Sequence, residues 1–383
     1  MSTEVAAAAI VRYGRVLTAR RTRPASLAGG WELPGGKVLP GESSAEAAER
    51  EVREELGCEI EVGRRLAGSQ ALESEYALTV HLASLVSGEP LPREHDAVRW
   101  LGPEELSDVG WLPADRPFVA QLGAVLLDGT RLPGGNVGGA VRVGGTVRRA
   151  RGPWTPSVHA LLMELRGPAG LVEVPRVYGF DERDREVLEY LPGRVPEPDL
   201  ETPSEELLGD AMRWLRRFHD AVEGASLPGP WRETTSAPGA GELLCHNDFA
   251  PYNVSVSTSA TGERLVGVFD WDLAGPATRL EDLAFAAWNW VPMWQVLPAA
   301  TAAYRLEVMA AAYRDVGAEQ ILDGVVPRIE KTVDLIRVGL ASGDAGMANL
   351  ASVGEPQRTV AALDALRGRV PDVRAALSRR GAT

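Results

Sequence analysis

The stretch from Gly29 to Cys58, GGWELPGGKVLPGESSAEAAEREVREELGC, decides the fold of the first half of the chain. Its glycines and prolines predict a loop over residues 28–41, and its second part predicts a helix. Ser43 and Glu46 form a capping box at the start of this helix, and Gly57 supplies its C-terminal stop. The apolar residues that recur at helical spacing predict the buried stripe: Ala45, Ala48, Val52 and Leu56.

Three glutamates, Glu51, Glu54 and Glu55, are spaced i, i+3, i+4 and therefore share one side of the predicted helix. Carboxylates this close repel one another unless a positive charge lies between them. Mg²⁺ prefers oxygen ligands and bridges carboxylates to substrate phosphates. The spacing therefore predicts a divalent cation site here, although a solvated acidic helix face has the same composition.

The loop before the helix contributes to the same site. Gly35 and Gly36 carry no side chain, so the backbone can approach the helix closely enough for a carbonyl oxygen to join the ligands. Arg50 can pair with Glu42 and hold the loop against the helix.

The order of these residues resembles the Nudix box: Gly36, five residues, Glu42, seven residues, then REVREELG at 50–57. WELPGGK at 31–37 and WLPADRP at 111–117 are similar to the MutT-like branch of the Nudix hydrolases. The resemblance covers about residues 4–126. It implies an α/β/α sandwich that hydrolyses nucleoside diphosphates linked to another moiety, with nucleoside triphosphates expected ahead of ADP-ribose or NADH.

Carried over by motif, Glu51, Glu54 and Glu55 bind Mg²⁺ or Mn²⁺, with a carbonyl from Gly35, and Glu51 and Glu54 are the catalytic carboxylates. The resemblance places three further residues around the nucleotide: Arg50, Glu94 and Asp115. Glu94, in EHDAVRW at 94–100, is a candidate extra ligand or base. Asp115 either reads the edge of the nucleobase or caps a helix predicted over 115–126, and the sequence leaves both open.

The second half contains a different set of polar residues, in ELLCHNDFAPYNV at 242–254 and FDWD at 269–272. Phosphoryl transfer needs a carboxylate for the acceptor hydroxyl, and an amide oxygen with a second carboxylate for Mg²⁺. Asp248 fits the first role, and Asn253 and Asp270 fit the metal roles. We expect His246 to brace the loop.

This spacing resembles the aminoglycoside phosphotransferase and choline kinase group over roughly residues 130–383. The resemblance implies a bilobal protein-kinase-like fold with a helical C-lobe, Mg²⁺ or Mn²⁺, ATP or GTP as phosphoryl donor, and a small-molecule hydroxyl as acceptor. Asp282, in EDLA at 281–284, matches the group's pattern, and we interpret it as a structural cap rather than a catalytic residue.

The small lobe departs from this family. The glycine cluster at 134–139, which includes Gly135, is either the nucleotide loop or the end of a linker. The family uses a lysine on the strand that here reads TVRR at 146–149, yet the chain has lysine only at positions 37 and 331. Arg149 or Arg148 must take its place, with Glu164 or His159 as partner. Two hypotheses follow for this half: a working kinase, or a non-catalytic binding or regulatory module.

Length, charge and cysteine content limit the remaining possibilities. The 383 residues predict two domains, 1–128 and 129–383, with a boundary in the loose segment near Leu126–Gly135. With 40 basic and 53 acidic residues, the net charge of −13 argues against a nucleic acid polymer as partner. Two cysteines and the lack of a signal peptide favour the cytoplasm.

One apolar stretch, Leu283 to Tyr304, carries no charge and is long enough to span a bilayer. Because Pro292 and Pro298 interrupt it, we expect a buried, broken helical segment and no membrane association. Its tryptophans are expected in the helix core rather than in a substrate cleft: Trp288, Trp290 and Trp294.

Overall fold

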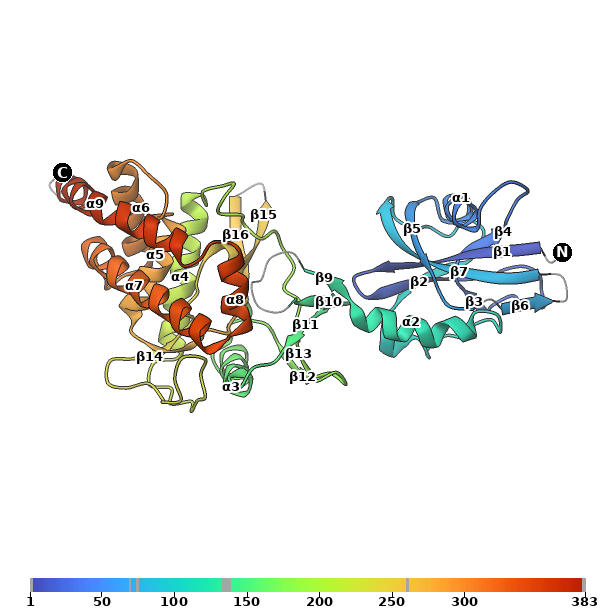
Figure 1. Cartoon of the computed structure of the whole chain (residues 1–383), viewed down its shortest axis with the longest axis horizontal. Coiled ribbons are helices and arrows are strands. Elements are labelled where there is room, and N and C mark those ends of the chain that lie inside the picture. The colour runs from blue at the N-terminus through green and yellow to red at the C-terminus, as the bar shows by residue number, and fades with distance from the viewer. Residues whose placement is uncertain (1–2, 69, 74–75, 133–138, 260–261, 381–383) are drawn as a thin grey trace. The chain divides into compact units, whose positions relative to one another are not determined.

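The computed structural model describes residues 3–68, 70–73, 76–132, 139–259 and 262–380, and the chain forms two compact units (Figure 1). The first unit comprises residues 1–133 and 140–148, and the second comprises 134–139 and 149–383. The division at residues 128/129 stays a proposal about which parts fold independently.

A mixed sheet of order β3-β2-β1-β7-β5 forms the centre of the first unit. β1 and β7 pair in parallel, with Val5 opposite Leu78, whereas β1 and β2 form an antiparallel hairpin around Tyr13 and Gly14. Three short strands complete the sheet, with β4 on β1, β6 on β7 and β8 on β2. The strands are β1 (Thr3–Arg12), β2 (Arg15–Arg20), β3 (Trp31–Glu32), β4 (Gly35–Lys37), β5 (Glu59–Arg65), β6 (Gln70–Glu73), β7 (Tyr76–Ser87) and β8 (Ala97–Leu101).

Two helices cover opposite faces of this sheet, α1 (Ser44–Leu56) and α2 (Arg116–Asp128) (Figure 1). Successive residues of a strand point to opposite faces, so β1 contributes to both layers. Ala6, Ala8 and Ile10 pack in the core that contains α1, and Ala7 and Ala9 pack in the core that contains α2. The first unit is therefore the predicted α/β/α sandwich.

The predicted ends of α1 are present. Ser43 and Glu46 form the capping box, and Gly57 adopts the left-handed conformation with φ 69°. The buried stripe differs at one position, because Ala47 is fully buried while Ala45, in the first turn, is only half-buried. The helix turns the face that begins at Ala47 and Ala48 toward the sheet.

A hairpin beyond the proposed boundary packs on the first unit. It consists of β10 (Val141–Val143) and β11 (Thr146–Ala150), and β9 (Thr130–Arg131) pairs with β10. The Arg142 guanidinium lies 3.8 Å from the centre of the Tyr13 ring, and a Cβ added at Gly14 would lie 2.7 Å from the Cα of Val143. The turn between β1 and β2 thus fits closely against this hairpin.

Helices dominate the second unit, as the resemblance implies for the C-lobe. After the hairpin of β12 (Val177–Phe180) and β13 (Arg185–Glu189), two small antiparallel ladders pair β14 with β17 and β15 with β16. These strands are β14 (Leu243–Cys245), β15 (Val254–Ser259), β16 (Gly262–Val268) and β17 (Gly275–Ala277). The helices are α3 (Thr155–Arg166), α4 (Glu205–Ala221), α5 (Arg279–Trp290), α6 (Ala299–Tyr313), α7 (Ala318–Ser342), α8 (Ala345–Ser352) and α9 (Gln357–Arg380).

The long apolar stretch is divided between α5 and α6, with Pro292 and Pro298 in the connection. Trp288 and Trp290 are buried in the core of the second unit, and Trp294 packs against that core from a partly buried position. This confirms the expected core role of the tryptophans. Within the described residues, no helix is both long and apolar enough to cross a membrane.

Candidate active sites

The glycine loop of the first unit lies directly against the acidic face of α1. The backbone N–H of Gly35 donates a hydrogen bond to Glu55 Oε2 at 3.1 Å. A Cβ added at Gly36 would lie 2.3 Å from the carboxyl carbon of Glu51. A side chain at this position would therefore displace the Glu51 carboxylate, and the close approach places two of the three predicted ligands beside the loop backbone.

Arg50 connects the loop to the helix, as the sequence indicates. Its guanidinium donates to both oxygens of Glu42, at 2.9 and 3.0 Å, to the Lys37 carbonyl at 3.0 Å and to Glu51 Oε1 at 2.8 Å. The hydrogen bonds from Arg50 hold the pKa of Glu42 below its ordinary value. Arg50 thus positions Glu51 and braces the loop at the same time.

The three glutamates differ in their exposure. The Glu54 side chain is 59% exposed and that of Glu51 is 17% exposed. Burial raises the pKa of Glu55 to about 7, and the nearby charges of Glu32 and Glu51 act in the same direction. A group of oxygen ligands whose charges oppose one another suits a hard divalent cation, which would offset that repulsion.

Glu32 and His95 also lie beside Glu55, and the motif spacing does not indicate either of them. His95 Nε2 lies 3.1 Å from Glu32 Oε1, and Arg21 donates to Glu32 Oε2 at 2.5 Å. Burial lowers the pKa of His95, but the hydrogen bond with Glu32 and the charge of Glu55 outweigh it and leave this pKa raised. Glu94, the candidate from the same segment, has an exposed side chain, and its carbonyl accepts from Thr22.

Asp115 precedes α2 but does not cap it through its side chain. Its Oδ1 accepts a hydrogen bond from the backbone N–H of Leu33 at 3.0 Å, and the residue is 4% exposed. Burial raises the pKa of Asp115 to about 7. The prediction that Asp115 caps the helix with its side chain is therefore wrong. The carboxyl bonds the backbone of Leu33 instead.

In the second unit, the loop after β14 gathers the predicted catalytic residues. Asp248 Oδ2 accepts from Asn253 Nδ2 at 2.9 Å, and Asp248 Oδ1 accepts from the Tyr252 hydroxyl at 3.1 Å. Asn253 Nδ2 also donates to the Asp248 carbonyl at 2.9 Å, so both of these hydrogen bonds come from the amide nitrogen. Burial and the charge of Asp270 raise the pKa of Asp248 to about 7.

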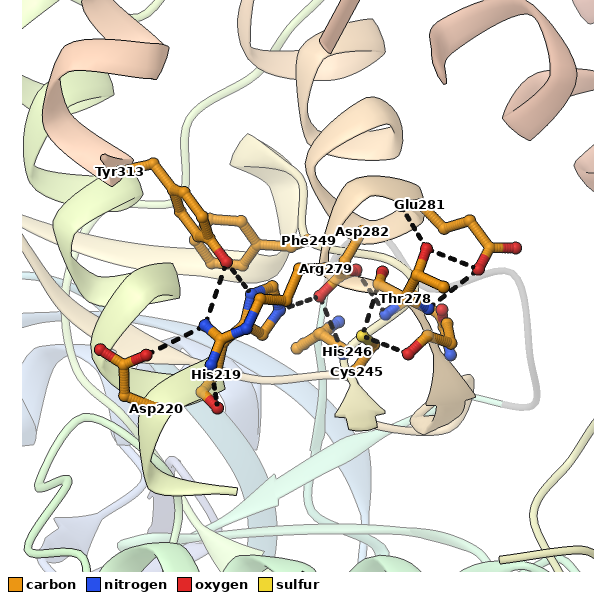
Figure 2. Close-up of polar contacts among 12 residues, drawn as sticks. His219, Asp220, Cys245, His246, Phe249, Thr278, Arg279, Glu281, Asp282 and Tyr313 are labelled. Carbon is orange, nitrogen blue, oxygen red and sulfur yellow. Dashed lines mark hydrogen bonds and ion pairs between the residues drawn. The ribbon is translucent and has the colours of Figure 1, made fainter. Parts of the chain in front are cut away.

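Asp282 caps this loop through its carboxylate (Figure 2). Its two carboxylate oxygens accept from the backbone N–H groups of His246 and Asn247, at 3.1 and 2.9 Å. His246 Nε2 lies 3.2 Å from the Phe269 carbonyl, so it links the Asp248 loop to the segment that carries Asp270. These contacts agree with the structural roles expected for Asp282 and His246.

Among the described residues, His219, Cys245 and Asp282 have potential metal-ligand atoms within 4.8 Å of one another. Both ring nitrogens of His219 are already hydrogen-bonded, to Asp282 Oδ2 at 3.0 Å and to the Tyr313 hydroxyl at 2.7 Å (Figure 2). The cluster is therefore a hydrogen-bonded support for the loop, and we assign no metal to it.

Arg149, on β11, contacts three carboxylates. It donates to Glu186 and Asp272 at 2.5 and 2.6 Å and to Asp270 Oδ1 at 2.9 Å, and His159 contacts the other oxygen of Glu186 at 3.0 Å. The acidic partner of this arginine is thus Glu186 on β13 rather than Glu164.

Three other predicted small-lobe residues have different positions. Glu164 is exposed on α3. The buried face of this helix is a different one, which includes His159 and Leu162. Arg148 precedes Arg149 on β11, and neighbouring residues of a strand point to opposite faces. Gly135 lies outside the described residues.

Comparison with protein families finds one match in each half of the chain. Residues 2–122 match the NUDIX domain, and residues 237–318 match the phosphotransferase enzyme family. These matches confirm the two resemblances predicted from the motifs.

Individual relatives are similar to parts of this chain. A putative 8-oxo-dGTP diphosphatase 2 of Mycobacterium tuberculosis is 47% identical over 125 residues, which are 32% of this chain and 89% of the relative. A CTP pyrophosphohydrolase of Escherichia coli is 41% identical over 118 residues, 30% of this chain and 87% of the relative. A trifolitoxin immunity protein of Rhizobium leguminosarum is 36% identical over 163 residues, 41% of this chain and 60% of the relative.

Proposed function

The chain belongs to the Nudix family through its first half, and from this premise we propose that this half hydrolyses nucleoside triphosphates with Mg²⁺ or Mn²⁺ to a nucleoside monophosphate and pyrophosphate. The observation that carries the proposal is the packing of the Gly35–Gly36 loop against Glu51 and Glu55. Two relatives that this chain covers almost completely are named for nucleoside triphosphates, which favours that substrate class over ADP-ribose or NADH.

The residues of the first unit have different proposed roles in this reaction. We propose that Glu51, Glu54, Glu55 and the Gly35 carbonyl hold the cation, which when bound neutralises phosphate oxygens and acidifies a water. Arg50 keeps Glu51 in place, and Glu54, the most exposed of the three carboxylates, faces the solvent from which water and nucleotide arrive. Asp115 remains the proposed contact to the nucleobase.

A substrate panel tests this proposal. The full chain is assayed with Mg²⁺ and equal concentrations of nucleoside triphosphates, including 8-oxo-dGTP and CTP, and of ADP-ribose and NADH. We expect kcat/KM to be at least about tenfold higher for a triphosphate, a difference of roughly 1.4 kcal/mol in transition-state binding. The products should be a monophosphate and pyrophosphate. A preference for ADP-ribose of the same size would contradict the assignment.

For the second half we propose phosphoryl transfer from ATP or GTP to a small-molecule hydroxyl. Asp248, Asn253 and Asp270 support it, since the loop after β14 brings the proposed base into hydrogen-bond contact with the Asn253 amide. We propose that Asn253 and Asp270 hold the divalent cation and that Asp248 receives the acceptor's proton. The relative named as an immunity protein does not specify an acceptor, so the acceptor is proposed by class alone.

One observation favours the alternative, a non-catalytic binding or regulatory module. Asp270 Oδ1, a proposed metal ligand, accepts from Arg149, the residue that stands in for the family's lysine. A bound nucleotide and its cation would have to replace this ion pair between Arg149 and Asp270. Calorimetry of the full chain with Mg·ATP and Mg·GTP decides between the two, in a Glu54→Gln background that slows nucleotide hydrolysis. A kinase is expected to bind one of these nucleotides at millimolar concentration or below. If neither binds, the kinase proposal fails and the second half is interpreted as a non-catalytic module.

A further inference from the structure

A hydroxyl group of the protein itself occupies the position where the proposed phosphotransferase needs its acceptor. Asp248 is the group proposed to receive the proton of an acceptor hydroxyl, and its two oxygens are used differently. Oδ2 accepts from the neighbouring amide of Asn253, whereas Oδ1 accepts from the phenol of Tyr252 at 3.1 Å. A donor hydroxyl within hydrogen-bond distance of the base is the arrangement that proton abstraction requires.

We propose that Tyr252 is a phosphoryl acceptor in its own right, so that the second half transfers the terminal phosphoryl group of a nucleoside triphosphate to Tyr252 of the same chain. The proposal rests on the phosphotransferase activity proposed above, and it adds a covalent modification site that this activity alone does not imply.

The position of Tyr252 in the loop supports this role. It lies in the short 3-10 turn Pro251–Asn253, directly before the proposed metal ligand Asn253. The residue is 40% exposed, so a nucleotide can approach its ring from the solvent. Its hydroxyl and the Asn253 amide both bond the Asp248 carboxylate, so the phenol lies beside one proposed ligand of the cation.

Two other tyrosines of the second unit show what distinguishes this one. The hydroxyl of Tyr313 is buried against His219, where no nucleotide can reach it. Tyr304 donates to Glu205 at 2.7 Å, so it shares the phenol–carboxylate contact. Its carboxylate belongs to α4 and not to the Asp248 loop. Tyr304 therefore serves as a matched control.

The proposed step transfers the γ-phosphoryl group of the nucleotide to the Tyr252 hydroxyl. The phenol oxygen of Tyr252 attacks the γ-phosphorus, and a new O–P bond forms as the bond from that phosphorus to the β–γ bridging oxygen breaks. The phenol proton passes to Asp248 Oδ1, and the nucleoside diphosphate leaves with the bridging oxygen. No oxidant or reductant is needed, and the nucleoside triphosphate with its divalent cation is the co-reactant.

Phosphorylation of Tyr252 should inhibit further phosphoryl transfer at this site. A phosphotyrosine carries a charge of about −1.5 to −2 at neutral pH, and here it would stand beside Asp248 and Asp270. Like charges at this distance disfavour a second anionic phosphate at the same place. We therefore expect the reaction to stop at one phosphoryl group per chain and to reduce later transfer to other acceptors.

The test uses the full chain carrying Glu54→Gln, incubated with Mg·ATP or Mg·GTP. The Nudix half would give a monophosphate and pyrophosphate, whereas transfer by the second half gives a nucleoside diphosphate, so the nucleotide products identify the active half. Peptide mass spectrometry over all tyrosines then locates any added HPO₃. We expect the diphosphate to form together with a single modification, on Tyr252.

Three variants in the same background sharpen the result. Tyr252→Phe keeps the ring and should lose the modification completely, and Asp248→Asn should slow it by roughly 10²-fold or more. Tyr304→Phe should leave it unchanged. Diphosphate formation with an unmodified Tyr252 would overturn this proposal and leave the phosphotransferase standing. No diphosphate and no modified tyrosine would also overturn this proposal, whereas the phosphotransferase itself stands or falls by the nucleotide calorimetry above, because its small-molecule acceptor is absent from this assay.

Discussion

Replacing Asp115 with asparagine should stabilise the protein, and more strongly at pH 8 than at pH 5. The carboxyl is buried, and its pKa is raised from 3.8 to about 7. Because the folded state holds the proton more tightly than the unfolded state, wild-type stability falls as pH rises from about 4 toward 7. Asparagine has nearly the same shape, keeps an oxygen for the Leu33 N–H and carries no charge.

The magnitude follows from the shift. About three pKa units at 1.36 kcal/mol each amount to a full penalty on the order of 4 kcal/mol above pH 7. Roughly 2–3 kcal/mol of it develops between pH 5 and pH 8. For a unit of this size, 1 kcal/mol moves the melting temperature by roughly 2–4 °C. The advantage of Asp115→Asn should therefore grow by about 5–10 °C between these two pH values.

Scanning calorimetry of both full-length proteins across this pH range measures the effect. Contributions that do not depend on pH cancel, since only the change in the difference between variant and wild type is compared. An advantage that is the same at both pH values, or one that shrinks as pH rises, would refute the assignment of a raised pKa to the buried Asp115 carboxyl.

Two further predictions address the two sites. Gly36→Ala should lower triphosphate hydrolysis by about 10²-fold, because its Cβ would lie 2.3 Å from the Glu51 carboxyl carbon and displace that side chain. Gly110→Ala, at a position with open space, is the control, and equal steady-state rates for both variants would be evidence against the loop packing. In the second half, Asp248→Asn should keep binding of Mg·ATP, whereas Arg149→Ala should weaken it, and calorimetry that shows the opposite order would contradict the assigned roles.

Local signals in the sequence predicted the secondary structure well. The capping box of Ser43 and Glu46 and the stop at Gly57 depend on residues a few positions apart, and both are present. The Arg50–Glu42 pair was predictable for the same reason, since one helix and its preceding loop contain both partners.

Contacts between distant segments were not predictable in this way. Glu32 meets His95 across 63 positions, and Arg149 meets Glu186 across 37. Glu164 matched the family's residue type, but the packing of α3 decides which side chain faces Arg149. The side chain of Asp115 bonds Leu33, 82 positions away, instead of the end of its own helix. Such pairings depend on tertiary packing, which spacing along the chain does not encode.

The central claim is that the first half hydrolyses nucleoside triphosphates at the carboxylates of α1, and Glu54→Gln tests it most directly. The measurement is pyrophosphate release by the full chain with saturating Mg²⁺ and the best triphosphate, beside Glu61→Gln, which changes an exposed glutamate on β5. We predict a loss of roughly 10²–10⁴-fold for Glu54→Gln only, at an unchanged or higher melting temperature, because one repelling charge is removed. An unchanged rate in Glu54→Gln would contradict the account.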